Sequence, residues 1–404
     1  MRFSELIWQY WSDSEDALET LGSFLYLGAH LRKKAGLGPH SILSDADGKE
    51  FKLKKADIKE AEELLFGLGT HPSSVTNIAA AASRQPVASG EDAHSVYEAL
   101  MREGVSCRDP SDDTGYAIGG ENVRGWVASV TEISIGLWAA HPAHFVPYLY
   151  LRRFDEFRAL CEELGIAIPP PPGENSWDKR ARYYLELNDA MLEFAQRYSL
   201  EPHELAAFLD DFGAKHLAIT EDEELPEPRT VWWLHGGTNN NGDGEFLDAA
   251  DAETTTSWQG NDQARRGDIA VMYCLAPRSH VHSVWRVVGN GHYDPFSYFS
   301  RVVQIGCPVV ALPRLSFREL AADTEFSKWP AVNAHFQGAS GRALPPPIYN
   351  ALVSMYAGRE VDVGTLPKLE PLSLPIGVEI EVESDVEERA RRRPRLPRAR
   401  LLGS

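Results

Sequence analysis

The spacing of apolar residues predicts helices through most of the first 213 residues. Between residues 3 and 34, apolar side chains recur every three or four positions, which two helices or one interrupted helix would satisfy. The strongest pattern lies between residues 176 and 213, where Tyr184, Leu187 and Met191 fall on one face. No helix is predicted for the variable polar stretch that ends near Asp92. Further helices are expected at residues 57–66, 93–102, 123–140 and 148–164.

The pattern changes to short β-rich runs after residue 229. Short helices are expected to follow them at residues 316–322 and 347–356. The predicted strands are Val231–Leu234, Ile269–Leu275, His282–Val288 and Val302–Ile305. We therefore expect an α+β protein. Its predicted parts are a mainly helical domain (1–218), an acidic, proline-bearing linker (219–229), a β-rich domain (230–357) and a Pro- and Arg-rich tail (358–404). The prolines at 169–172 leave open a division of the helical domain into two subdomains near residues 165–175.

Negative charge is concentrated in the N-terminal half of the chain. The whole chain has 40 Lys and Arg against 59 Asp and Glu, a net charge of -19. Residues 1–227 carry 21 basic against 39 acidic residues, residues 228–357 carry 10 against 11, and residues 358–404 carry 9 of each. This distribution excludes a DNA-binding protein of the histone kind. The nearly neutral β-rich domain can still bind a polyanion through a local basic patch.

Secretion, membrane insertion and metal binding have no signal in the sequence. No apolar run approaches the roughly 18 residues of a membrane helix, and the N-terminus lacks a secretory segment, so we expect a cytoplasmic protein that does not bind membranes. The four cysteines are scattered without CxxC pairs, which predicts reduced, mostly buried thiols. Because no GxxxxGK[ST], HExxH or GxSxG motif occurs, we predict no catalytic residue, no metal and no cofactor.

Aromatic residues are concentrated between residues 232 and 336. Strand alternation places Trp232 and Trp233 on opposite faces, so at most one is expected in a core while the other faces a pocket or solvent. An extruded base is held by stacking on such rings, with a few polar groups at its edge. A single ring is more often part of a core, but the cluster favours a base-binding pocket. Its members are Trp232, Trp233, Trp258, Tyr273, Trp285, Tyr293, Phe296, Tyr298, Phe299 and Phe336.

Four segments of the β-rich domain carry the most specific motifs. They are Ser257–Asn261, Arg265–Tyr273, His282–Arg286 and His335–Arg342. In order and spacing they resemble the EVE domain, a PUA-like β-barrel related to YTH readers of modified RNA, over about residues 228–357. The resemblance implies a closed barrel that recognises a methylated or hydroxymethylated cytosine in DNA. The helical half is similar, more weakly, to regions that precede such modules in bacterial modification-dependent restriction proteins.

The resemblance and the aromatic cluster together give two sets of candidate site residues. By resemblance, Trp258 precedes a Gly-Asn turn, and Tyr273 and Trp285 line the barrel. The full predicted base pocket is Trp232, Trp233, Ser257, Trp258, Gln259, Asn261, Tyr273, Trp285 and Phe336. Basic residues near these positions predict phosphate contacts, and a small residue followed by glycine lets backbone N–H groups approach an anion. The predicted phosphate or backbone contacts are Arg265, Arg266, Arg278, Ser340, Gly341 and Arg342.

The function expected from these observations is recognition of 5-methylcytosine or 5-hydroxymethylcytosine in DNA by base flipping. The protein would be the recognition component of a restriction or anti-phage system, with a nuclease or motor protein as a partner. One alternative is a nuclease or other hydrolase with its site in the N-terminal half, which the barrel would target to its substrate. Another is a protein-interaction scaffold that binds RNA or a nucleotide. The tail, with seven arginines and no acid after Glu388, predicts a nucleic-acid-binding arm, the start of a further domain or a solubilising segment.

Overall fold

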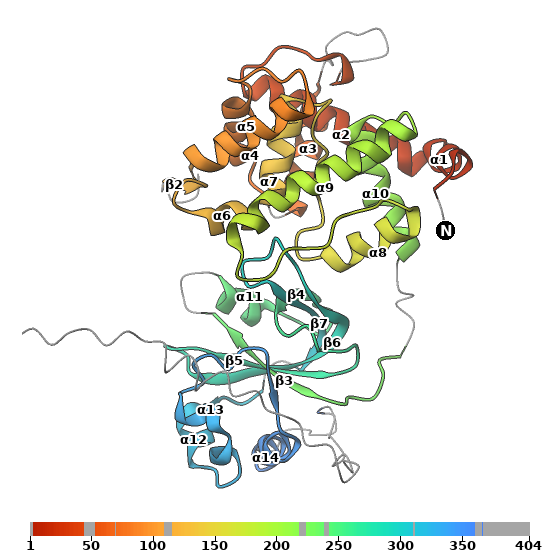
Figure 1. Ribbon diagram of the computed structural model, residues 1–404. Helices are drawn as coiled ribbons and strands as arrows, with labels where there is room; N and C mark the ends of the chain where they lie inside the picture. Colours follow the sequence, from red (N-terminus) through yellow and green to blue (C-terminus); the bar gives the residue numbers. More distant parts are fainter. Residues whose placement is uncertain are drawn as a thin grey trace, which may run out of the picture.

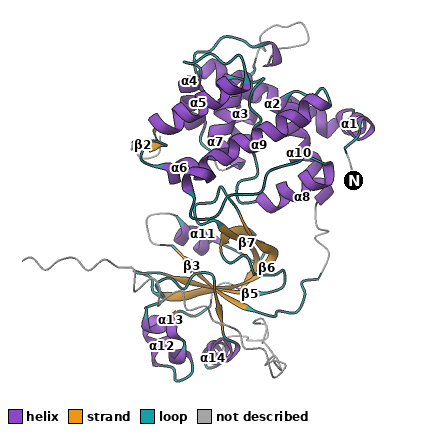
Figure 2. Ribbon diagram, viewed as in Figure 1, coloured by secondary structure: helices purple, strands orange, loops and turns teal. Residues whose placement is uncertain are grey.

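The computed structural model describes residues 3–43, 53–68, 70–108, 115–217, 224–237, 242–309, 312–359 and 366. They form a mixed α/β structure, in which a helical part precedes an open mixed β-sheet that carries further helices (Figures 1 and 2). Residues 219–223 of the predicted linker and most of the predicted tail, including all of its arginine-rich end, lie outside the described residues. In the portion of the chain that is described, no helix is long and apolar enough to span a membrane.

The helices of the N-terminal part share one hydrophobic core. Trp138 and Leu187 are among its fully buried members. Polar side chains fix the helix ends: Ser14 Oγ accepts a hydrogen bond from the Ala17 N–H at the start of the second helix. The elements are α1 (Glu5–Ser12), α2 (Glu15–Lys34), the 3-10 turn η1 (Ser41–Leu43), α3 (Lys55–Gly67), α4 (Pro72–Ala82), α5 (Gly90–Glu103), the hairpin β1 (Val105–Arg108) and β2 (Gly115–Ile118), α6 (Val123–Ala128), α7 (Val130–Ala140), α8 (Phe154–Leu164), α9 (Trp177–Arg197) and α10 (Pro202–Leu217).

Three helix predictions need correction. The polar stretch before Asp92 contains α4, which packs against α7 mainly through small residues, with Val75 and Ile78 as its large buried apolar side chains. The helix predicted over 123–140 is two helices that meet at Ser129. The helix predicted from residue 148 begins at Phe154, because the preceding residues 145–150 are buried in the core without forming a helix or strand and end in a turn at 151–152. There the Tyr148 N–H donates to Ser134 Oγ at 2.9 Å.

The C-terminal part is built on one open sheet. Its strands are β3 (Val231–Gly236), β4 (Thr256–Gln259), β5 (Ile269–Cys274), β6 (His280–Tyr293), β7 (Arg301–Val309), β8 (Leu315–Ser316) and β9 (Arg342–Leu344). Their order is β4-β7-β6-β5-β3-β9, and β8 pairs with β6. Strands β3 and β5 are parallel, with Val231 opposite Ile269, and the other pairs are antiparallel.

The predicted closed PUA-like barrel is wrong. Among the described residues, the edge strands β4 and β9 do not pair with each other. The edges approach through a side-chain hydrogen bond from Asn261 Nδ2 to the Gly341 carbonyl oxygen at 2.8 Å, and not through a strand ladder. The sheet is therefore open and mixed.

Both faces of the sheet are covered. One face packs on α12 (Phe317–Ala322), the turn η2 (Phe326–Lys328), α13 (Pro330–Asn333) and α14 (Pro346–Ala357), and the opposite side carries α11 (Asp243–Ala249) and faces the helical part (Figure 1). Trp233 is buried in the first core and Trp232 in the second. The two rings do lie on opposite faces, as alternation predicts. The expectation that one of them faces a pocket or solvent is wrong, because each face has its own core.

The loop between β6 and β7 joins the two parts of the molecule. Phe296 in this loop belongs to the core of the helical part, where its ring lies 4.9 Å from that of Tyr148. Arg180 of α9 is fully buried and donates to the carbonyl oxygens of Pro295 and Ser297 in the same loop. The sheet is thus anchored to the helices at the position where a cleft opens between them.

Candidate functional site

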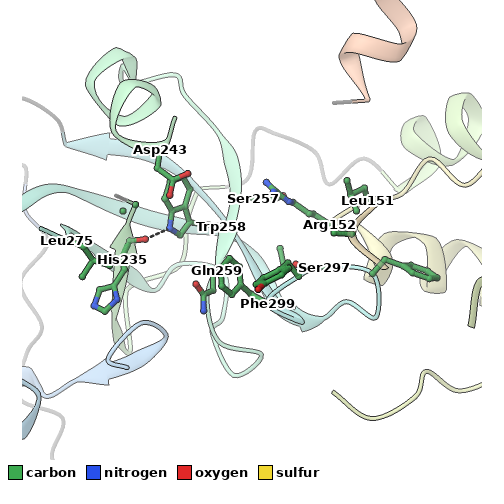
Figure 3. A pocket seen from close by; sticks show the side chains of 16 residues that line it. Leu151, Arg152, His235, Asp243, Ser257, Trp258, Gln259, Leu275, Ser297 and Phe299 are labelled. Atoms are coloured by element: carbon green, nitrogen blue, oxygen red, sulfur yellow. Dashed lines mark hydrogen bonds between the residues drawn. The ribbon is translucent and has the colours of Figure 1, made fainter. Parts of the chain in front are cut away.

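A cleft of about 520 Å³ lies between the helical part and the sheet (Figure 3). Loops supply most of its wall from the helical side, and β3, β4, α11 and the β6–β7 loop supply the other side. This volume falls within the range of pockets that take small ligands. The lining residues are Ala128, Leu151, Arg152, His235, Gly236, Gly237, Asp243, Ser257, Trp258, Gln259, Leu275, Phe296, Ser297, Tyr298, Phe299 and Val302.

Trp258 is the best-positioned aromatic ring of the cleft. It lies on the edge strand β4, opposite Val303 of β7, and its indole N–H donates to the His235 carbonyl oxygen at 2.9 Å. The Phe246 ring of α11 stacks on it with centroids 6.1 Å apart and an interplanar angle of 27°. These contacts fix the orientation of a half-buried indole that still lines the cleft. Such a ring offers a preformed surface for stacking.

The β6–β7 loop presents two further aromatic rings. The side chains of Tyr298 and Phe299 are 46% and 55% exposed, although both are large and apolar. They lie edge to face with centroids 5.0 Å apart, and Tyr298 also contacts the Trp177 ring at 6.0 Å. Exposed aromatic residues grouped at a concave site are typical of a binding surface, not of a core.

Polar groups of the cleft differ in their charge and partners. Arg152 and Asp243 are the arginine and the aspartate of the lining. Burial lowers the pKa of His235 to about 4, so its imidazole is neutral at pH 7, and its Nε2 is shielded from solvent without a hydrogen-bond partner. Ser257 and Gln259 add a hydroxyl and an amide beside Trp258. The cleft can therefore hydrogen-bond the edge of a planar ligand.

The structure brings three of the predicted base-pocket residues together, namely Ser257, Trp258 and Gln259. The other aromatic residues of that set are divided between two cores, Trp233, Tyr273 and Phe336 in one and Trp232 and Trp285 in the other. Strand alternation sends neighbouring side chains to opposite faces, and the sheet lies between the two groups.

Asn261, the remaining member of the predicted pocket, has a structural role. Its side chain donates to the Gly341 carbonyl oxygen and accepts from the Gln263 N–H, both at 2.8 Å. It is not among the residues that line the cleft.

The predicted phosphate contacts are mostly engaged within the protein. Arg265 donates to two carbonyl oxygens of its own loop, and Arg278 forms a two-bond ion pair with Asp248 at 2.8 and 2.7 Å. Arg266 has a backbone hydrogen bond to the Asn290 side chain. None of these arginines lines the cleft.

In the segment from Ser340 to Arg342, the backbone N–H groups that were expected to bind an anion donate hydrogen bonds within the protein. The Gly341 N–H donates to the Trp233 carbonyl oxygen at 2.8 Å, and the Arg342 N–H donates to Ala339 at 3.0 Å. Ser340 Oγ accepts from the His235 N–H. The Arg342 side chain is exposed on β9 and does not line the cleft.

Sequence reasoning missed the contribution of the helical half to this cleft. Ala128, Leu151 and Arg152 come from that half. Tyr298 and Phe299 were counted in the aromatic cluster, but their exposure at the cleft could not be inferred from strand periodicity because they lie in a loop. Arg152 has a left-handed backbone conformation, with φ of +63°. Arginine seldom adopts this conformation, so nothing in the residue type pointed to this position before the structure was known.

Comparisons with protein-family models, curated proteins and solved structures found no match to this chain. The identification with the EVE domain is therefore corrected, since no family match accompanies the open sheet. The residues that the structure describes contain no group of three or more His, Cys, Asp or Glu side chains that could hold a metal ion.

Proposed function

We propose that this protein binds a single base of a nucleic-acid strand in the cleft between the helical part and the sheet. The observation that carries the proposal is Trp258, a half-buried indole fixed by the His235 carbonyl oxygen and by Phe246, at the wall of a cleft of base-accommodating size. Stacking of a base on an aromatic side chain contributes about 1–3 kcal/mol and tolerates different bases. Ser257 and Gln259 would read the edge of the bound base.

The exposed rings of Tyr298 and Phe299 extend the stacking surface to a neighbouring base. Their loop is anchored by the buried Arg180, so the two rings are presented without the cost of ordering a free loop. The modified cytosines expected from the sequence, 5-methylcytosine and 5-hydroxymethylcytosine, are the bases with which the proposal is first tested.

The test is fluorescence anisotropy of labelled single-stranded oligonucleotides that carry cytosine, 5-methylcytosine or 5-hydroxymethylcytosine at one position. Trp258→Ala is expected to weaken binding by about five- to a hundredfold, the loss of one stacking contact. The double variant Tyr298→Ala/Phe299→Ala removes two half-exposed rings, and we expect it to weaken binding with only a small loss of stability.

Tyr10→Ala is the matched control, because Tyr10 is 82% exposed on α1 and does not line the cleft. It should bind like the unmodified protein. The proposal fails if no oligonucleotide binds, or if Trp258→Ala and the Tyr298/Phe299 variant both bind as the unmodified protein does. A preference among the three cytosines would identify the modification, and equal binding would overturn the expectation of a modified-base sensor.

A further inference from the structure

We infer that the ligand of the cleft is a nucleotide whose phosphate is bound by Arg152, so that the helical part supplies the anion-binding half of the site. The inference rests on the proposed function and adds the charge of the ligand to it. Arg152 lies in the connection before α8, on the opposite wall from Trp258, and Figure 3 shows its guanidinium extending toward the Trp258 side of the cleft.

The Arg152 and Arg153 side chains differ in their contacts with the rest of the protein. Within the described part of the chain, the exposed Arg152 guanidinium has neither a hydrogen bond nor an ion pair. Arg153 turns back to the helical part, where it contacts Glu156 at 3.5 Å and lies over the Tyr150 ring. Two adjacent arginines thus have opposite roles, and the one that faces the cleft is free to bind an anion.

The backbone of Arg152 is held in a conformation that an arginine seldom adopts. Its φ of +63° is in the left-handed region, which favours glycine. The surroundings impose this conformation: the next N–H, that of Arg153, donates to the Tyr150 carbonyl oxygen at 3.0 Å, and the Arg152 N–H faces the Asp294 carboxylate. Strained residues that are fixed by their surroundings are concentrated at ligand-binding positions. Here the strain directs a cation into a cleft.

The charge distribution of the cleft places the anion on the Arg152 side. Arg152 belongs to the helical wall of the cleft, whereas Asp243, the acidic residue of the lining, belongs to α11 on the sheet side. A ring stacked on Trp258 would leave its phosphate directed to the helical wall. A guanidinium binds phosphate through two parallel N–H donors, which gives orientation as well as affinity.

The test is competition against a labelled oligonucleotide by deoxycytidine, deoxycytidine 5′-monophosphate and inorganic phosphate, with the full chain. We expect the nucleotide to compete about tenfold more strongly than the nucleoside, the effect of one charge-assisted contact. Inorganic phosphate should compete more weakly than either, because it lacks the ring. In Arg152→Gln the nucleotide and nucleoside should become equal, and the salt dependence of oligonucleotide binding should fall by about 0.7 in log–log slope.

Two variants separate this role from a structural one. Arg158→Gln makes the same change of charge at an exposed position of α8 outside the cleft, and should keep the preference for the nucleotide. Arg152→Gly removes the backbone strain, and should raise the urea midpoint of unfolding while abolishing the preference.

The outcomes distinguish the two proposals. Failure of the oligonucleotide to bind defeats the proposed function itself. Oligonucleotide binding with equal competition by nucleoside and nucleotide, a preference that survives Arg152→Gln, or phosphate that competes as well as the nucleotide overturns the assignment of Arg152 alone.

Discussion

The Nε of Arg180, on α9, donates a hydrogen bond of 2.8 Å to the carbonyl oxygen of Pro295 in the β6–β7 loop. The same guanidinium donates to Glu174 and Ser297 carbonyl oxygens and lies over the Trp177 ring at 4.1 Å. A fully buried arginine is tolerated because its donors meet carbonyl oxygens that would otherwise be unpaired. This contact sets the position of the loop that presents Tyr298 and Phe299.

Arg180→Met should destabilise the protein by more than about 3 kcal/mol, because it leaves several buried carbonyl oxygens without a donor. Arg180→Lys should lose less stability than Arg180→Met, since an ammonium keeps the charge although it cannot reproduce the planar fork of the guanidinium. Urea unfolding followed by tryptophan fluorescence measures both. Arg182→Gln, on the same helix, breaks an exposed ion pair with Glu98 and should cost less than about 1 kcal/mol. Equal losses at the two positions would contradict this account.

A buried carboxylate in the same loop makes stability depend on pH. Burial raises the pKa of Asp294 from its ordinary 3.8 to about 6, although its Oδ1 accepts hydrogen bonds from the Phe296 and Ser297 N–H groups. The folded state therefore binds a proton more tightly than the unfolded chain. The stability that this group contributes is present below about pH 4 and is lost as the pH rises through 6.

Asp294→Asn should remove the loss of stability with rising pH, because an amide keeps an acceptor oxygen and does not ionise. Relative to the unmodified protein, the variant should gain stability as the pH rises from 4 to 7. Tyr148, His292 and Arg180 also face this carboxylate, so the comparison is made with these residues unchanged. Urea midpoints of both proteins at several pH values give the answer, and a difference that does not change with pH would refute the role of Asp294.

The sequence predicts elements with a strong period much better than elements built from small residues. The apolar helical face at the start of the 176–213 pattern is confirmed as α9, and the apolar run of β5 is confirmed close to its predicted limits. In contrast, the buried face of α4 has only two large apolar side chains, Val75 and Ile78, and otherwise small residues such as Ser74, Ala79 and Ala82, so its hydrophobic period is weak. Closure of the sheet was inferred from motif resemblance, and no local pattern decides whether β4 and β9 pair.

The candidate site was predictable where its residues lie together on one strand. Ser257, Trp258 and Gln259 are consecutive on β4 and were all expected in the pocket. Arg152 reaches the same cleft from a distant part of the chain, through the docking of the β6–β7 loop on α8 and α9. Such a tertiary contact leaves no trace in the spacing of residues. Trp233 and Trp285 illustrate the opposite error, because an aromatic residue of a sheet covered on both faces is part of a core.

Asp268 ties the start of β5 to β3 and should be essential to the sheet. Its buried carboxylate accepts hydrogen bonds from the Trp232 indole at 2.9 Å and from the Arg265 and Thr230 N–H groups at 3.0 and 3.1 Å. Asp268→Ala leaves these donors unpaired and should cost more than about 3 kcal/mol. Asp268→Asn should also destabilise, by about 2 kcal/mol, because its NH₂ would meet donors.

Thermal and urea unfolding of the Asp268 variants provide the measurement. Asp251→Asn is the control, since Asp251 makes similar turn contacts to Glu253 and Thr254 at an exposed position. We expect it to change stability by less than about 1 kcal/mol. If Asp268→Asn were as stable as the unmodified protein, the carboxylate would not be required.

The close packing of α4 on α7 should reverse the usual effect of replacing a helical glycine. Gly136 lies on α7, and a Cβ there would be 2.7 Å from Ile78 Cγ2 and 3.0 Å from the Val75 carbonyl oxygen. Alanine in place of glycine improves helix propensity by about 1 kcal/mol. Overpacking of a buried contact costs about 1–3 kcal/mol, and the backbone oxygen of Val75 cannot move as a side chain can. Gly136→Ala should therefore lower stability.

Gly22→Ala provides the matched comparison, because Gly22 is also helical, on α2, and the nearest atom to its added Cβ would be Tyr26 Cε2 at 3.9 Å. Only the helix propensity changes at this position, so Gly22→Ala should be more stable than the unmodified protein by up to about 1 kcal/mol. Opposite signs of the two shifts in urea midpoint are the expected result. If both variants were stabilised, α4 and α7 would have to lie farther apart than the structure places them. The α4 helix, which the sequence pattern does not reveal, would then also lose its main contact with the core.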